Sequence, residues 1–415
     1  MGSWDGEIER NQRGGLGIVG GPLEGIKVLE LCHFLAGPYA GLVLADLGAD
    51  VVKIEDPSHP DDARSMGPYF QNGQSLYFVA LNSGKRSVGV RFDTEGGRAV
   101  IEDLVRSADV VITNFRPGVL AKFGIDHVAL HRINPEIVTC SLTGYGETGP
   151  DAQNPGYDYT IQARAGVMSL AGEPDGPPTK AGISYVDHSG GLSAALGVCA
   201  ALVERAKTGA GRHIDLGLFD VQISMLTYLA SWQRNSNAEL ERTSNSAHPS
   251  LVPAQNFRTQ DGYLSLFVGN DAMWSRFVEA LGDETLGDER FTTRQGRLDH
   301  KGDLIDRIQD TLLTGSGRFW EERFGNYGVA CGIVNDIAGA LEEPQTAARE
   351  LIASAEHPVY GRYEHVRGPL SSLRAEGERP APLLGENTVE VLDELGYSRT
   401  RIETLQQAGT VTGGP

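Results

Sequence analysis

This sequence has few cysteines, few basic residues and no long apolar run. Its four cysteines are far apart and no CxxC pair occurs, so we expect neither a disulfide framework nor a zinc ribbon, and a reducing cytoplasm is the expected compartment. Lys and Arg number 36 against 55 Asp and Glu, which gives a net charge of -19. This charge argues against non-specific binding to nucleic acid or to an acidic membrane surface. No uninterrupted apolar run is long enough to cross a bilayer.

Two common enzyme signatures and a secretion signal are also missing. There is no GxSxG nucleophile elbow, so serine hydrolysis is not supported, and there is no Walker motif that would indicate ATP. Residues 1–22 are rich in glycine and charge and lack the apolar core of a signal peptide. We therefore expect a flexible tail there.

What the sequence does contain is an alternation of short β-branched runs and helical patterns. We predict strands at 26–31, 50–54, 109–115, 137–142 and 213–218, and helices at 38–47, 94–107, 191–207 and 220–234. Strands that alternate with helices favour an α/β fold with a parallel sheet covered on both faces. The polar stretch 235–250 is typical of a linker, and the shorter elements at 251–340 predict a smaller second domain.

One carboxylate is distinguished by its sequence context. Asp187 follows an apolar, strand-like run at 181–186 and precedes Gly190 and Gly191, where a helix is predicted to begin. A helix N-terminus favours an ionised carboxylate through its dipole and free N–H groups, and glycines let a ligand approach the backbone. A nucleophilic aspartate needs these conditions. The alternative interpretation is an ordinary helix N-cap, which is the commoner role of Asp at such a position.

Two other patterns give weaker indications. Residues 144–149 (GYGETG) match GxGxxG after a strand, but prolines follow where the dinucleotide fingerprint needs a helix. We therefore expect a glycine loop near some ligand and no NAD site. His127 and His131 have the i, i+4 spacing of metal ligands, but no Glu or third ligand lies nearby in the sequence. We expect two solvent-facing histidines and no metal.

Basic side chains cluster in loops at the ends of early elements, although the chain as a whole is acidic. They are Arg64, Lys85, Arg86, Arg116 and Lys122. In a parallel sheet, the loops after the strand C-termini form the ligand crevice, and cations there suit phosphates. Ordinary surface charge is the alternative interpretation.

A series of motifs occurs in the order known from one enzyme family. They are GPLEGIKVLEL (21–31), AGPYAGLVLADLGADVVKIE (36–55), LNSGKRS (81–87), NFRPG (114–118), TGYGETGP (143–150), GYDYTIQA (156–163), EPDGPPTKAG (173–182), VDHSGG (186–191), KTGAGRHIDLGLFD (207–220) and APLLGENT (381–388). From about residue 21 to residue 398, the sequence resembles the family III CoA-transferases of the CaiB/BaiF type. This group includes formyl-CoA transferase and the related α-methylacyl-CoA racemase.

The resemblance implies that CoA moves from an acyl-CoA, possibly succinyl-CoA, to a free carboxylic acid. It places the nucleophile on Asp187, which forms an acyl anhydride and then an aspartyl-CoA thioester without metal, ATP or a permanently bound cofactor. The active-site loop positions are Gly146, Tyr157, Gly190 and Gly191. Each tetrahedral intermediate needs N–H donors, and Gly190 and Gly191 can present their backbone as oxyanion donors because they have no side chain in the way. The resemblance places CoA binding at His33, Phe34, Leu35, Ala36, Arg64, Lys85, Arg86, Asn114, Phe115, Arg116 and Lys122.

Tyr157 separates the transferase from the racemase. Racemases of this group have a histidine there, which pairs with the aspartate as a second base. A phenol ordinarily titrates near 10 and is a poor base near neutral pH, so transfer is favoured over racemisation of a 2-methylacyl-CoA. His188 is not expected to substitute, because it points differently from Asp187. A non-catalytic CoA-ester-binding protein is the third alternative.

Two positions depart from formyl-CoA transferase. Leu35 stands where that enzyme has glutamine, and its tetraglycine loop is replaced by a stretch that contains His248. Oxalate is therefore not the expected acceptor. His248 is a candidate for the acyl pocket or belongs to a structural turn.

The resemblance also implies a domain order and an assembly. The expected parts are a tail (1–22), a Rossmann-like large domain (23–225), a linker (226–250), a small α+β domain (251–340) and a segment returning to the large domain (341–415). Members of the family form interlocked homodimers, so we expect segments near 225–250 and 340–365 to thread through the partner chain. Acyl-CoA and a carboxylic acid are the expected ligands, without nucleic acid or membrane.

Overall fold

A computed structural model of the chain describes residues 20–373, 377 and 379–413. These residues form two compact units. Unit 1 comprises residues 20–158, Tyr185–Val221 and residues 351–413, and unit 2 comprises Tyr159–Ser184 and Gln222–Glu350. Most of the predicted N-terminal tail, residues 1–19, lies outside the described residues.

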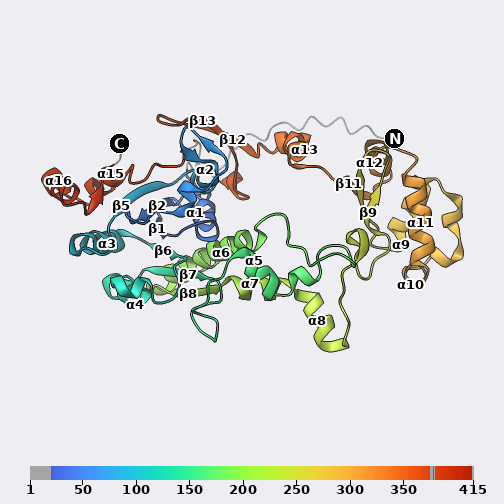
Figure 1. Cartoon of the computed structure of the whole chain (residues 1–415), viewed down its shortest axis with the longest axis horizontal. Coiled ribbons are helices and arrows are strands. Elements are labelled where there is room, and N and C mark those ends of the chain that lie inside the picture. Colours follow the sequence, from blue (N-terminus) through green and yellow to red (C-terminus); the bar gives the residue numbers. More distant parts are fainter. Residues whose placement is uncertain (1–19, 374–376, 378, 414–415) are drawn as a thin grey trace. The chain divides into compact units, whose positions relative to one another are not determined.

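A seven-stranded sheet forms the centre of unit 1 (Figure 1). Its strands are β1 (Lys27–Leu31), β2 (Asp50–Glu55), β5 (Arg86–Val90), β6 (Val110–Thr113), β7 (Val138–Thr143), β8 (His213–Gly217) and β14 (Val411–Thr412). The order is β14-β5-β2-β1-β6-β7-β8, and every neighbouring pair is parallel except β14 with β5. The predicted α/β fold with a parallel sheet is confirmed. The strand order reverses between β1 and β6, which is where doubly wound sheets bind their ligands.

Helices pack on both faces of this sheet. α3 (Glu95–Ser107), α4 (His127–Ile133) and α15 (Thr388–Glu394) share one apolar core with Leu29 and Leu31 of β1. Val28 and Glu30 alternate to the opposite face. There α1 (Ala36–Asp46) and α6 (Tyr185–Thr208) pack against each other and against the sheet. Both faces are therefore covered, as a parallel sheet requires.

Close packing of α1 and α6 depends on small residues. A side chain on Gly191 would lie 2.7 Å from the Ala36 carbonyl oxygen of α1. One on Gly190 would lie 2.3 Å from Leu218 Cδ2, which belongs to another helix. Within the described part of the chain, α6 is the one helix whose length and apolar composition suit a membrane span. Its packing on α1 and β7 is that of a core helix.

The remaining elements of unit 1 come from both ends of the chain. They are β3 (Phe70–Gln71), β4 (Gln74–Ser75), α2 (Leu76–Asn82), β12 (Ile352–His357), β13 (Gly361–Val366) and α16 (Arg399–Gln407). In Figure 1 the red C-terminal α15 and α16 lie beside the blue β5 and α3. Hydrogen bonding agrees with this arrangement, because Ser87 N donates to Asn387 Oδ1 at 3.0 Å across 300 residues.

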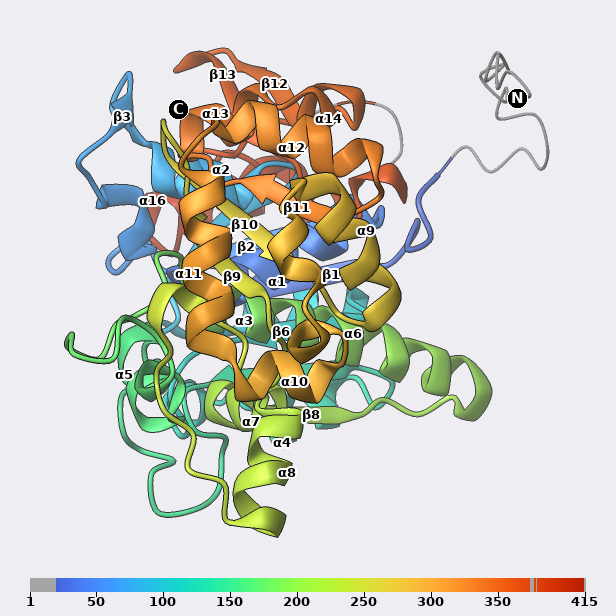
Figure 2. The same cartoon turned by 90° about the vertical axis from the view of Figure 1, so that its right-hand side faces the viewer.

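Unit 2 contains a three-stranded antiparallel sheet, β11-β10-β9, with helices gathered around it (Figure 2). Its strands are β9 (Ala254–Arg258), β10 (Tyr263–Phe267) and β11 (Ala330–Ile333). Its helices from residue 227 onward are α8 (Thr227–Ser236), α9 (Asp271–Leu281), α10 (Arg294–Asp299), α11 (Lys301–Leu312), α12 (Gly317–Asn326), α13 (Ile337–Glu342) and α14 (Pro344–Ala348). Its core is aromatic and includes Trp274, Phe277, Phe291, Trp320 and Phe324.

Two local predictions are wrong. Residues 181–184 form no strand, and α6 begins at Tyr185, six residues before the predicted start. The predicted helix 220–234 is two helices, α7 (Leu218–Met225) and α8, which meet at Thr227 with a φ of 34°. The other strands of the predicted sheet lie within one or two residues of their expected bounds.

Candidate functional site

A pocket opens where the strand order of unit 1 reverses. It is bordered by the loops after β1, β6 and β7 and by the start of α6, and we call it the switch-point pocket. The predicted residues that line it are His33, Phe34, Leu35, Ala36, Asn114, Phe115, Arg116, Tyr157 and Asp187. Residues as far apart in the sequence as His33 and Asp187 therefore meet at one site.

Asp187 lies on the first turn of α6. It is the third residue of the helix and is half-buried. The helix is capped by another carboxylate, since Val186 N donates a 3.0 Å hydrogen bond to Asp158 Oδ1. The N-cap interpretation of Asp187 is therefore wrong, and its side chain lines the switch-point pocket.

The loop after β1 adopts a strained conformation that is fixed from two sides. Phe34 has a φ of 62°, in the left-handed region that non-glycine residues rarely adopt. Its N–H donates to Asp61 Oδ1 at 2.9 Å. Asn114, after β6, accepts from His33 N at 2.9 Å and donates to His33 O at 2.7 Å. Strain of this kind persists where the surroundings over-determine it, and it is concentrated at functional sites.

A buried ion network lies beneath this loop. Lys53 Nζ contacts Glu30 Oε1 at 3.0 Å, Asp61 Oδ2 at 2.9 Å and the Cys32 carbonyl oxygen at 2.7 Å. Burial alone would lower the pKa of Lys53, but the carboxylates of Glu30 and Asp61 outweigh it and raise the pKa. The network therefore stays charged and holds the loop in place.

Three of the predicted CoA-binding cations belong to such internal networks, and their binding of CoA stays a prediction. Lys85 is buried, and its Nζ contacts Glu30 Oε2 at 2.7 Å and the Pro38 carbonyl oxygen at 2.8 Å. Burial lowers the pKa of Lys85 to about 8. Arg86 pairs with Asp50 and, at 2.7 Å, with Glu394. These side chains are already neutralised inside the fold and position α1 and the sheet.

Arg64 follows the same pattern, whereas two other cations remain accessible. Arg64 Nη2 lies 2.6 Å from Glu55 Oε2. Arg116 and Lys122 are exposed, and neither has an ion pair among the described residues. Arg116 lines the switch-point pocket, and Lys122 lies on the short 3-10 turn Leu120–Phe123 outside its lining.

The structure places the two predicted oxyanion glycines inside a helix. Gly190 and Gly191 lie in the second turn of α6, where backbone N–H groups bond to carbonyls one turn earlier. They are not free donors, and their lack of a side chain serves packing. Gly146 has a φ of 80° and faces Asp215 outside the pocket. Tyr157 lines the pocket and its ring meets Phe34 edge-on at 6.1 Å.

Tyr77 has an electrostatic environment that the sequence did not reveal. It lies on α2, and burial together with the carboxylates of Asp187, Asp61 and Asp158 raises the pKa of Tyr77 to about 12. Its hydroxyl therefore keeps its proton near Asp187. No motif marks it, because its environment comes from three separate segments.

The loop after β7 was indicated only in general terms by the glycine-rich motif. Thr143 and Gly144 line the switch-point pocket, and no helix follows at residues 150–157. His248 belongs to unit 2, where its Nδ1 accepts from Ser250 N at 3.1 Å. That contact fits the structural-turn interpretation.

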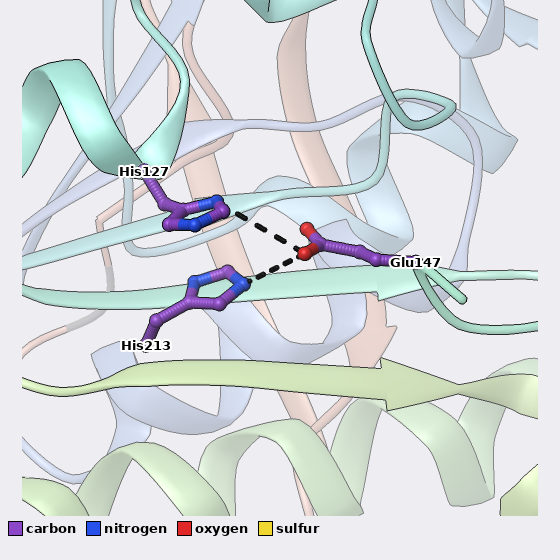
Figure 3. Close-up of side chains that lie close together, drawn as sticks. All are labelled: His127, Glu147 and His213. Carbon is purple, nitrogen blue, oxygen red and sulfur yellow. Dashed lines mark hydrogen bonds and ion pairs between the residues drawn. The ribbon is translucent and has the colours of Figure 1, made fainter.

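A second cluster lies on the α4 side of the sheet (Figure 3). Glu147 Oε2 is 3.1 Å from His213 Nε2 and 4.0 Å from His127 Nδ1. The prediction that His127 has no acidic or third partner is therefore wrong. His131 lies outside this cluster, with its Nδ1 2.8 Å from the His127 carbonyl oxygen.

Comparison with known proteins agrees with this architecture. Residues 23–388 match the model of CoA-transferase family III. The chain is 39% identical over 398 residues to a succinate–glutarate CoA-transferase of Agrobacterium fabrum, covering 94% of this chain and 98% of that protein. It is 35% identical over 395 residues to the human succinyl-CoA:glutarate CoA-transferase, covering 94% and 90%.

A solved structure shares the fold. The crystal structure of a CaiB/BaiF family protein from Brucella suis superposes with a TM-score of 0.80 at 37% identity and covers 91% of this chain and 100% of that one. The family match, the relatives and the fold agree with one another, and this chain belongs to CoA-transferase family III and is a CoA-transferase.

Proposed function

We propose that the enzyme moves CoA from an acyl-CoA to a free carboxylic acid through covalent intermediates on Asp187. The observation that carries the proposal is the position of Asp187, which lines the switch-point pocket together with the loops after β1 and β6. A nucleophilic carboxylate has to be within reach of the thioester, and ligands of doubly wound sheets bind at this point.

The proposed reaction exchanges activated acyl groups of similar energy. An Asp187 oxygen attacks the thioester carbonyl carbon, a C–O bond forms, and the C–S bond breaks as CoA thiolate leaves with the electron pair. The thiolate then attacks the aspartyl carbonyl carbon, which gives an aspartyl-CoA thioester and releases the first acid. The incoming carboxylate attacks this thioester, and the freed thiolate attacks the new acyl carbonyl to form product and regenerate Asp187.

The surroundings support this chemistry. Arg116 is an exposed cation on the pocket wall, which suits the phosphates of CoA. Phe34 and Tyr157 offer aromatic walls to this pocket.

The relatives suggest the substrate class. The names of the Agrobacterium and human proteins include succinyl or succinate and glutarate. We propose that this enzyme also uses a dicarboxylic donor and acceptor, with succinyl-CoA as the first donor to test.

We further propose that it acts in the cytoplasm as an interlocked homodimer, with residues 23–225 and 341–415 forming the large domain and 251–340 the small one. Light scattering on the purified chain at low and high protein concentration tests the dimer. A monomer at every concentration contradicts it.

The decisive experiment uses Asp187→Asn, which keeps the shape of the side chain and removes the nucleophile. We expect loss of exchange between labelled acids and acyl-CoA. Borohydride or hydroxylamine, added during turnover of the wild type, should modify Asp187, which peptide mass spectrometry locates. Full exchange activity in Asp187→Asn contradicts the mechanism. Deuterium uptake at the α-carbon without an acceptor acid would indicate the racemase instead.

A further inference from the structure

We propose that His127, Glu147 and His213 form a binding site for a first-row divalent metal ion of the Zn²⁺ class. The proposal does not depend on the transferase mechanism. The three side chains come from three elements, namely the first residue of α4, the loop after β7 and the first residue of β8. Figure 3 shows all three pointing toward one another.

The donor set fits such an ion. Two imidazoles and one carboxylate are ligands that Zn²⁺ and similar ions accept, with open positions left for water. The nitrogen and oxygen atoms concerned all lie within 4.8 Å of one another. Zn²⁺ at its usual ligand distances sets neighbouring ligand atoms about 3.4 Å apart in a tetrahedron. The pair Glu147–His213 is already at 3.1 Å, and His127 has to approach from 4.0 Å by a small side-chain rotation.

Both imidazoles lie beside Glu147, and one of them has to turn before they can share an ion. The rings stack with centroids 3.8 Å apart and planes 13° from parallel, so their in-plane lone pairs converge on one point only when His127 rotates out of the stack. Thr139 Oγ1 lies 2.9 Å from His213 Nδ1, which leaves His213 Nε2 facing Glu147. When Nδ1 carries the proton and donates to Thr139, the lone pair of Nε2 is available to a metal. Histidine ligands in metal sites are held by such second hydrogen bonds.

The loop that carries Glu147 is also fixed from outside the cluster. Asp215 Oδ1 accepts a hydrogen bond from Glu147 N at 2.9 Å and keeps the loop in position.

The cluster is reachable from outside. His127 and Glu147 line a second pocket of about 240 Å³ on the α4 side of the sheet, which leaves room for water ligands. This second pocket shares Phe115, Arg116 and Pro117 with the switch-point pocket. An ion here would tie α4, the loop after β7 and β8 together, next to the wall of the proposed CoA site.

The test is calorimetric titration of chelator-treated, full-length protein with Zn²⁺, and visible absorption after Co²⁺ addition. We expect saturable binding of one ion per chain, a Co²⁺ absorption band, and a higher unfolding temperature with metal. Glu147→Gln and His127→Gln should each weaken binding by about tenfold or more. His131→Gln is the matched control, since this histidine lies one turn away on α4 outside the cluster, and it should bind as wild type does.

Three results overturn the proposal. They are no saturable binding by the wild type, equal affinity in Glu147→Gln, or an equal loss in His131→Gln and His127→Gln. Circular dichroism in EDTA checks folding. His127→Gln keeps the test decisive if the other variant does not fold, because His127 is partly exposed at the start of α4.

Discussion

Gly191→Ala tests whether the contact between α1 and α6 holds the site together. The new methyl carbon would lie 2.7 Å from the Ala36 carbonyl oxygen and 3.2 Å from Ala40 N, both backbone atoms. Backbone atoms inside a helix cannot rotate away, so the two helices have to separate. Gly197→Ala, six residues further along the same helix, places its methyl carbon 3.6 Å from two carbons of Ile214, which is an ordinary contact.

The pair of variants isolates the steric cost. Each replaces a helical glycine by alanine and gains about 1 kcal/mol of helix propensity. That gain cancels in the comparison, so the difference between the two is the overpacking cost at Gly191, about 1–3 kcal/mol. For a unit of this size, 1 kcal/mol shifts the unfolding temperature by about 2–4 °C. We therefore expect Gly191→Ala to unfold about 2–12 °C below Gly197→Ala.

Calorimetry or circular dichroism at one protein concentration measures this difference. CoA exchange should fall in Gly191→Ala, because α6 carries Asp187 and α1 begins at Ala36 on the pocket wall. Gly197→Ala should keep wild-type exchange. Equal stability and equal exchange in the two variants would refute the reasoning.

Three further predictions concern the loops and the pH dependence. Asn114→Ala removes both hydrogen bonds to His33, so we expect the free energy of unfolding to fall by about 1–3 kcal/mol. The KM for acyl-CoA should rise in steady-state kinetics, and an unchanged KM contradicts this prediction. Asp61→Ala removes one of the carboxylates that pair with buried Lys53, so the free energy of unfolding in urea should fall by about 3–5 kcal/mol. A decrease of under 1 kcal/mol contradicts this prediction. Burial lowers the pKa of His213 in the native state below 6.5. As the pH drops below 6.5, the unfolded chain therefore binds a proton at His213 before the native state does, and the free energy of unfolding decreases. His213→Gln should flatten that slope, and an unaltered slope in pH-dependent unfolding argues against it.

The sheet was predictable because its strands are short β-branched runs that have to be buried on both faces. The start of α6 was not. Residues 181–186 are apolar enough to suggest a strand, yet Ile183 is 67% exposed while Val186 is fully buried. Composition alone does not show which of these side chains is exposed. The helix begins at Tyr185, within the apolar run.

Partners distant in sequence account for the contacts that the sequence did not reveal. Lys85 and Arg86 have the composition of a phosphate-binding loop, but Glu30 and Glu394 neutralise them from far along the chain. His213 meets Glu147 across 66 residues, so spacing arguments that work within one helix could not find it. By contrast, the loops at the switch point were predictable from the family motifs, because each motif follows its own strand.

The edge of the central sheet has a consequence for biosynthesis. β5 is completed beside β14 and is bonded by Asn387, which the ribosome adds 300 residues after Ser87. Until that late segment emerges, the nascent β5 edge presents unpaired N–H and C=O groups that can pair with another chain. A stalled or prematurely terminated product is therefore exposed to aggregation at this edge, and chaperone capture of such products would be directed there.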